Sequence, residues 1–206
     1  MTIPLPPRIY LASHSPRRRE LLTQIGVLFD SLISRGSPRQ DPEVDETPFP
    51  GEDPVAYVQR VTLAKAEHGV RLMTMRHLIA QPVLAADTTV AVDGQILGKP
   101  KDGADAERML KLLSGSSHRV LTALALVWND QTRSTLSETM VHFRPLEPGE
   151  IARYIASGEP MDKAGAYGIQ GRAGLFVRRL EGSYSGVMGL PLFETGELLR
   201  ECGYPL

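Results

Sequence analysis

Residues 9–22 read IYLASHSPRRRELL, and the rest of the chain is best interpreted outward from this stretch. The apolar residues Ile9 to Leu11 predict a short buried strand, and small polar residues follow them. Pro16 suits the first position of a helix, and Ser15 before it is a natural N-cap. The stretch therefore predicts a strand, a tight turn and the N-terminus of a helix.

Arginines are concentrated at the start of this predicted helix. Arg17 and Arg18 oppose the helix dipole, which is positive at the N-terminus, so a simple surface helix would be destabilised locally. An anionic ligand removes that cost, because free N–H groups at a helix start bind anions and guanidinium groups match phosphate oxygens. We expect a phosphate-binding site that uses Ser15, Arg17 and Arg18. The alternative is a capped surface helix with solvated arginines.

Composition narrows the class of protein. The chain has 206 residues, of which 42% are hydrophobic and 23% charged, which is typical of a globular protein with one large domain or two small lobes. A net charge of -1 disfavours a broad nucleic-acid-binding surface. Cys202 is the single cysteine, so neither a disulfide framework nor a thiolate zinc site is expected.

The start of the chain and its hydropathy bear on localisation. Residues 1–7 are proline-rich and lack the apolar core of a signal peptide, so we expect a flexible tail there. No apolar stretch is long enough to span a bilayer. We therefore expect a cytoplasmic protein that does not bind membranes.

Further elements follow from periodicity and turn residues. Strands are expected at residues 29–33, 82–90, 118–128, 132–144 and 174–180, with a hairpin over 90–97 and another joining the two long strands. Helices are expected at residues 54–69, with a resumption towards 79, at 102–113 and 148–157, and from 191 onward.

Three charged residues fall where a ligand could bind. Asp87 is expected at the carboxyl end of a central strand, where open α/β sheets place ligands, although it could simply cap the following turn. Lys65 lies near the apolar side of its helix, so its ammonium either extends outward to water or points into a cleft. Lys99 is constrained between a glycine and a proline.

An acidic loop over residues 36–53 contains Glu43, Asp45 and Glu46. Loops of this length in a compact domain often have a function. A solvated acidic loop is nevertheless the simpler interpretation unless the loop folds over a site.

The second dense stretch, residues 162–171, reads DKAGAYGIQG. Its glycines allow a backbone to approach a ligand closely, but it matches neither the dinucleotide-binding nor the P-loop pattern. The amide of Gln170 both donates and accepts, so it could read the edge of a base. The alternative is a glycine-rich connection with a solvated glutamine. The histidines show no spacing typical of metal ligands.

Taken together, these stretches resemble the Maf family of nucleotide pyrophosphatases. The matching pieces are S-x-SPRR at 13–18, ADT at 86–88, GKP at 98–100, KAGAYGIQG at 163–171 and VMGLPL at 187–192. The resemblance implies an α/β fold with a long central mixed β-sheet flanked by helices and two lobes around a cleft, as in the related inosine triphosphate pyrophosphatases. It implies a single domain over residues 1–206.

The resemblance also implies an activity. Family members hydrolyse nucleoside triphosphates between the α and β phosphates, releasing the monophosphate and pyrophosphate with the help of a divalent metal. Oxygen ligands favour Mg²⁺ or Mn²⁺ over zinc. The AYGIQ form of the second stretch, with threonine after Asp87, is similar to the branch that prefers dTTP and UTP.

Residue roles carry over from the same motifs. Asp87 resembles the family's proton acceptor, and Arg17, Thr88 and Gln170 match positions tied to substrate choice. Clustered cations suit a triphosphate, since its charge and that of the leaving pyrophosphate both need stabilisation.

The remaining site positions are also carried over from the resemblance. Lys65 and Lys99 match lysines of the family's cleft, and Glu46 resembles the acidic residue of its second loop, so Glu46 and Asp87 are candidate metal ligands. His14 departs from the family, which often has a small residue there. Its imidazole either crowds the turn or adds a phosphate donor.

Other functions stay open at this stage. One is a broader house-cleaning pyrophosphatase for modified pyrimidine nucleotides, and another is a non-catalytic, nucleotide-binding regulator of septum formation. A nucleic-acid binder is disfavoured by the near-neutral charge. The resemblance suggests a homodimer.

Overall fold

The computed structural model describes residues 7–33 and 44–206. Residues 1–6, nearly all of the expected tail, and Glu43 of the acidic loop lie outside the described residues. The strands are β1 (Ile9–Leu11), β2 (Phe29–Ser31), β3 (Val83–Val92), β4 (Gln95–Leu97), β5 (Ser117–Trp128), β6 (Gln131–Phe143) and β7 (Val177–Glu181). The α-helices are α1 (Pro16–Gln24), α2 (Pro54–Met75), α3 (Gly103–Leu113), α4 (Pro148–Ala156), α5 (Tyr184–Met188) and α6 (Leu192–Glu201).

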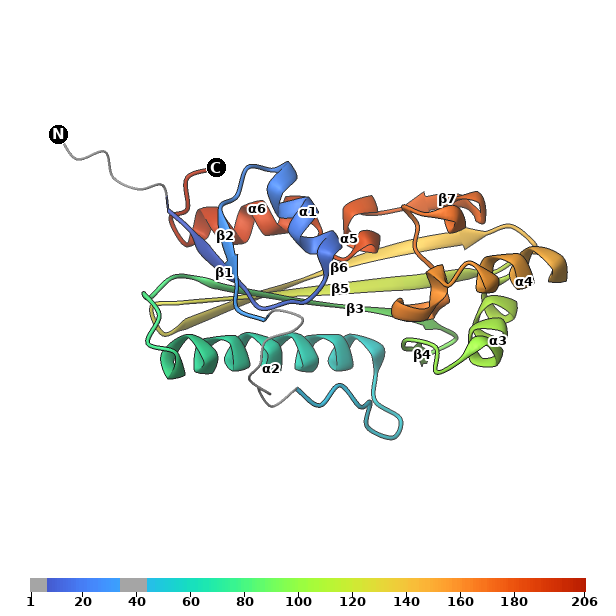
Figure 1. Ribbon diagram of the computed structural model, residues 1–206, viewed down its shortest axis with the longest axis horizontal. Coiled ribbons are helices and arrows are strands. Elements are labelled where there is room, and N and C mark those ends of the chain that lie inside the picture. The colour runs from blue at the N-terminus through green and yellow to red at the C-terminus, as the bar shows by residue number, and fades with distance from the viewer. Residues whose placement is uncertain (1–6, 34–43) are drawn as a thin grey trace.

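In the described ranges, seven strands form one mixed sheet in the order β2-β1-β3-β5-β6-β7, with β4 paired to β3. Strand β1 is parallel to β2 and β3, and the other pairs are antiparallel. The long strands β3, β5 and β6 run along the longest dimension of the molecule (Figure 1). Asn129 and Asp130 join β5 to β6 with φ of 49° and 59°, the left-handed pair that a tight hairpin requires.

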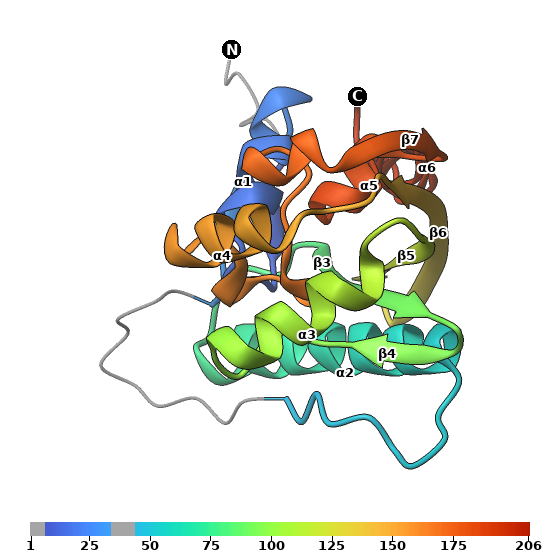
Figure 2. The same ribbon diagram turned by 90° about the vertical axis from the view of Figure 1, so that its right-hand side faces the viewer.

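Helices cover both faces of this sheet, so the fold is α/β as predicted (Figures 1 and 2). Successive side chains of a strand point to opposite faces. On one face, Ala85 and Ala125 pack with Ala66 of α2. On the other, Leu84 packs in a cluster with Leu198 of α6. The sheet is therefore buried on both sides along its central strands.

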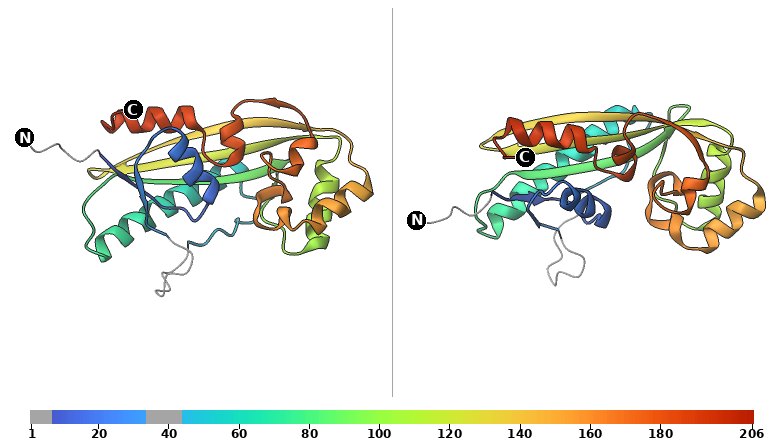
Figure 3. Two further views of the ribbon diagram at one scale, coloured as in Figure 1. Left: turned by 45° about the horizontal axis from the view of Figure 1, so that its top comes forward. Right: turned by 90° about the horizontal axis from the view of Figure 1, so that it is seen from above.

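Two of the apolar clusters lie towards opposite ends of the sheet, in agreement with the two-lobed expectation. One apolar cluster joins Leu22 of α1 and Leu199 of α6 to the β1 end. The other joins Met109 of α3 and Ile151 of α4 to Val120 of β5. The views in Figure 3 show α1 and α6 towards one end of the long strands and α3 and α4 at the other.

Several expected boundaries were wrong; β2, for example, ends at Ser31 and not at residue 33. Helix α2 continues through Gly69 to Met75. Gly69 does not end the helix; it lets the helix pack closely on the sheet, since a Cβ there would lie 2.8 Å from Val83 and 2.9 Å from Ala12. The last strand begins at Val177 and not at residue 174, because residues 172–175 form the 3₁₀ turn η3. Helix α5 was not predicted from the sequence.

No helix within the described ranges combines the length and apolar character needed to cross a membrane.

Candidate active site

The site forms where one edge of β3 has no neighbouring strand. Pairing with β1 reaches Leu84, and pairing with β4 begins at Val90. Within the described residues, the intervening part of β3 is therefore paired only with β5. Asp87 lies in this open section. The expectation that it ends its strand was wrong, since uninterrupted pairing with β5 carries β3 on to Val92.

A cavity of about 1210 Å³ opens at this edge, between the two lobes. His14, the residue that departs from the family pattern, also lines it. The structure thus brings together every residue predicted for the site from the sequence, namely Ser15, Arg17, Arg18, Glu46, Lys65, Asp87, Thr88, Lys99 and Gln170.

Three charged side chains lie in contact in the cavity, with Lys65 between Asp87 and Glu46. The ammonium of Lys65 lies 2.7 Å from Oδ1 of Asp87 and 2.8 Å from Oε1 of Glu46. The Lys65 side chain is 15% exposed and that of Asp87 is 11% exposed. Of the two alternatives for Lys65, the structure therefore selects the cleft. The ammonium compensates the charge of a carboxylate that would otherwise be costly to bury.

Thr88 points to the opposite face of β3, towards α1 and α5. There it meets Arg18, whose guanidinium donates to Thr88 Oγ1 (3.2 Å), to Ser13 Oγ (3.0 Å) and to the main-chain oxygen of Gly189 (2.7 Å). Burial lowers the pKa of Arg18. Three of its five N–H groups are thus used within the protein, so Arg18 joins the predicted phosphate turn to the base of the cleft.

The predicted phosphate turn has the expected form. Helix α1 begins at Pro16 with Ser15 as its N-cap residue, but the Ser15 side chain makes no capping hydrogen bond. Arg17 is only partly exposed, and its Nη1 lies 4.0 Å from Oδ2 of Asp162 on the other lobe. The turn and the glycine-rich segment therefore face each other across the cleft.

The cavity is basic although the whole chain has a net charge of -1. Its lining includes seven lysines and arginines against four aspartates and glutamates. Lys101, Arg108 and Lys163 were missed from the sequence, although Lys163 stands in the quoted motif. The excess of positive charge suits a polyanion.

A hydrogen-bond network holds the turn that presents Gln170, which is exposed and lines the cavity. The Tyr154 hydroxyl accepts from Gly168 N (3.2 Å) and donates to Glu159 Oε1 (3.0 Å). Glu159 Oε2 accepts from Arg172 N (3.2 Å). These hydrogen bonds thus fix the backbone two residues before and two residues after Gln170.

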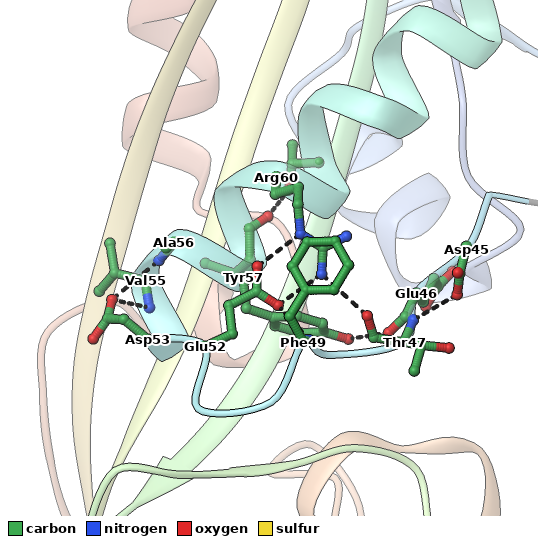
Figure 4. A network of polar contacts seen from close by, with 12 residues as sticks. Asp45, Glu46, Thr47, Phe49, Glu52, Asp53, Val55, Ala56, Tyr57 and Arg60 are labelled. Atoms are coloured by element: carbon green, nitrogen blue, oxygen red, sulfur yellow. Dashed lines mark hydrogen bonds and ion pairs between the residues drawn. The ribbon is translucent and has the colours of Figure 1, made fainter.

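The described part of the acidic loop, residues 44–53, is not merely solvated, because Val44, Glu46 and Pro48 line the cavity. Figure 4 shows residues 45–53 lying against the start of α2. The Tyr57 hydroxyl donates to the main-chain oxygen of Glu46 at 2.9 Å. Burial, with smaller contributions from Asp87 and Glu46, raises the pKa of Tyr57 to about 12. The Tyr57 hydroxyl therefore stays protonated at neutral pH and can donate this hydrogen bond.

The two carboxylates beside Lys65 offer oxygen donors, the ligand type that a magnesium-like cation prefers. Among the described residues, no group of three or more His, Cys, Asp or Glu could hold a metal by itself. Glu46 and Asp87 nevertheless converge on one ammonium. Mg²⁺ is commonly bound by one or two carboxylates together with substrate phosphates.

Comparisons with known proteins identify the family of the chain. A family model described as Maf-like protein matches residues 8–202. A dTTP/UTP pyrophosphatase of Dechloromonas aromatica (strain RCB) is 58% identical over 96% of this chain and 98% of its own length. A dTTP/UTP pyrophosphatase of Aromatoleum aromaticum is 59% identical over 98% of this chain and 99% of its own. One of Nitrosomonas europaea is 56% identical over 95% and 94%. The chain belongs to the Maf-like protein family.

Proposed function

We propose that this protein is a nucleoside triphosphate pyrophosphatase that hydrolyses dTTP and UTP between the α and β phosphates. The observation that carries the proposal is the Asp87–Lys65 pair at the open edge of β3, inside a cavity rich in cations. The matching relatives, which are named dTTP/UTP pyrophosphatases, support the choice of substrate.

The chain's own residues account for the chemistry. Asp87 accepts a proton from the water that attacks the α-phosphorus, and Lys65 orients this carboxylate through its 2.7 Å hydrogen bond. Arg17, Lys99 and the turn at Ser15 bind the phosphates, and Arg18 braces that turn. These cations also stabilise the charge that grows on the leaving pyrophosphate.

We also propose a Mg²⁺ or Mn²⁺ cofactor. Glu46 and Asp87 would hold it, with substrate oxygens completing its coordination. When bound, the metal neutralises phosphate charge and favours the attacking water.

Base selection is assigned to the glycine-rich turn. The Gln170 amide can pair with the O4 and N3–H edge shared by thymine and uracil. We assign further substrate contacts to Thr88 and Arg17, which line the same cavity as Gln170.

The first test is a panel of nucleoside triphosphates with purified protein and Mg²⁺ or Mn²⁺, following the monophosphate, pyrophosphate and orthophosphate separately. Pyrophosphate release that is faster from dTTP and UTP than from purine nucleotides supports the proposal. Orthophosphate as first product would mean cleavage at another bond. Turnover confined to modified pyrimidine nucleotides would favour the house-cleaning role.

The proposal also covers the domain organisation, the cellular compartment and the partners of the protein. We infer that the chain acts as a single domain in the cytoplasm, with a small nucleotide as its ligand and neither membrane nor nucleic acid as a partner. A homodimer, which the family resemblance suggests, stays a prediction that sedimentation of the purified protein tests.

A further inference from the structure

A segment over residues 44–53, here called the strap, brings Glu46 to the catalytic pair. Its position depends on α2, the helix that also carries Lys65 (Figure 4). Tyr57 donates to the main-chain oxygen of Glu46 (2.9 Å), and Arg60 Nη2 donates to that of Thr47 (3.1 Å). Two consecutive carbonyl groups of the strap are therefore anchored on one helix.

Arg60 also binds the distal part of the strap. Its Nε and Nη2 donate to the two carboxylate oxygens of Glu52, each at 2.7 Å. Glu52 Oε2 also accepts from Phe49 N (2.9 Å), and the Arg60 guanidinium carbon lies 4.1 Å from the centre of the Phe49 ring. This bidentate, stacked arrangement uses the planar geometry that distinguishes arginine from lysine.

Packing alone does not hold Glu46 in place. Its side chain is 45% exposed, and residues 45–51 of the strap are exposed throughout. Its carboxylate nevertheless lies 2.8 Å from the Lys65 ammonium. An ion pair with a partly exposed partner contributes little, because holding the two side chains in one geometry costs entropy. The hydrogen bonds from Tyr57 and Arg60 restrain the backbone at Glu46 and Thr47 and so keep the Glu46 carboxylate near Lys65.

We propose that Tyr57 and Arg60 are positioning residues of the active site, which hold the strap so that Glu46 stays within reach of Lys65 and Asp87. This inference rests on the proposed function. The hydrogen bonds of Tyr57 and Arg60 go to the strap and not to Lys65 or Asp87. They act on turnover through Glu46.

The first variant is Tyr57→Phe, which keeps the ring in the core and removes the donor to Glu46. We expect kcat to fall about fivefold, as for the loss of one neutral hydrogen bond. Tyr204→Phe is the matched control, since its hydroxyl also bonds to backbone, accepting from Leu28 N (3.0 Å), but far from the cleft. The control should keep the wild-type kcat.

The second variant is Arg60→Met, for which we expect kcat to fall at least tenfold, because several contacts are lost together. Its matched control is Arg144→Met. Arg144 likewise makes a bidentate pair, with Glu150 (2.9 and 2.7 Å), and lies 5.8 Å over the ring of Phe176. Hydrogen exchange of the strap amides should accelerate in Arg60→Met and stay unchanged in Arg144→Met.

A double-mutant cycle shows whether Arg60 acts through Glu46. If it does, the combined Glu46→Gln, Arg60→Met variant should be no slower than Glu46→Gln alone. Losses that multiply would overturn the inference, as would strap variants with wild-type turnover and exchange. If Arg60→Met does not fold, the same cycle is run with Tyr57→Phe.

The two failures are distinguishable. Pyrophosphate release from dTTP or UTP by the wild type, the controls and the strap variants alike would refute the positioning role and leave the function intact. A wild type that releases no pyrophosphate from any nucleotide would refute the proposed function, and the inference would fall with it.

Discussion

Titration of His118 should make this protein less stable in mild acid. His118 lies in β5 with 1% of its surface exposed, and its Nε2 is 2.8 Å from the hydroxyl of Tyr167. Its Nδ1 has no hydrogen-bond partner among the described residues. Burial, with a smaller contribution from His142, lowers the pKa of His118 from 6.5 to about 4. The imidazole is therefore neutral in the folded protein.

The sign and size of the effect follow from linkage. Between pH 6.5 and about 4, the unfolded chain binds a proton at His118 that the folded protein does not, so stability falls as pH falls. The stability that neutral His118 contributes is fully present above pH 6.5, the pKa of this histidine in the unfolded chain. A shift of this size corresponds to about 3 kcal/mol in total, and to about 2 kcal/mol between pH 7 and pH 5.

The assay is urea unfolding of the wild type and of His118→Gln at pH 5, 6 and 7. Glutamine offers a neutral amide to Tyr167 and does not titrate. The free energy of unfolding of the variant should lose about 2 kcal/mol less than that of the wild type between pH 7 and pH 5. Above pH 7.5 the two pH dependences should coincide. The same pH dependence in both proteins at low pH would refute the assignment.

Further predictions concern the proposed activity. Asp87→Asn should lower turnover by at least roughly 10²-fold, the lower end for a lost general base, and near-normal pyrophosphate release by the folded variant would remove Asp87 from the chemistry. Gln170→Glu should weaken the preference for dTTP and UTP over purine nucleotides, whereas an unchanged substrate profile would exclude base reading by this amide. Tyr154→Phe removes the hydroxyl that joins Gly168 N to Glu159. The variant should raise KM for dTTP and UTP more than it lowers kcat. Equal effects on all nucleotides would count against a role of this network in positioning Gln170. Chelation of divalent cations should abolish turnover, and added Mg²⁺ should restore it; full activity in excess chelator would disprove the metal requirement.

Local structure could be predicted because it depends on neighbouring residues. Pro16 marks the start of α1, and Asp53 caps α2 through the backbone N–H groups of Val55 and Ala56. The turn at Asn129 and Asp130 sets the β5–β6 hairpin. Such signals lie within a few residues of the element that they define, so a single sequence contains them. Most site residues also stood out as local candidates, but their specific roles were taken from the family resemblance.

Tertiary structure decided how those residues act. Asp87 is a site residue because β1 stops short along the edge of β3, which no local pattern of residues 82–90 encodes. Lys65 meets Asp87 across 22 residues, and Arg18 meets Gly189 across 171. The sequence by itself predicted most of the helices and strands, although not α5, and showed which charges are available to a phosphate ligand. Only the packing of α2 and α1 on opposite faces of one sheet decided which charges pair, because pairing depends on distances that chain neighbours do not set.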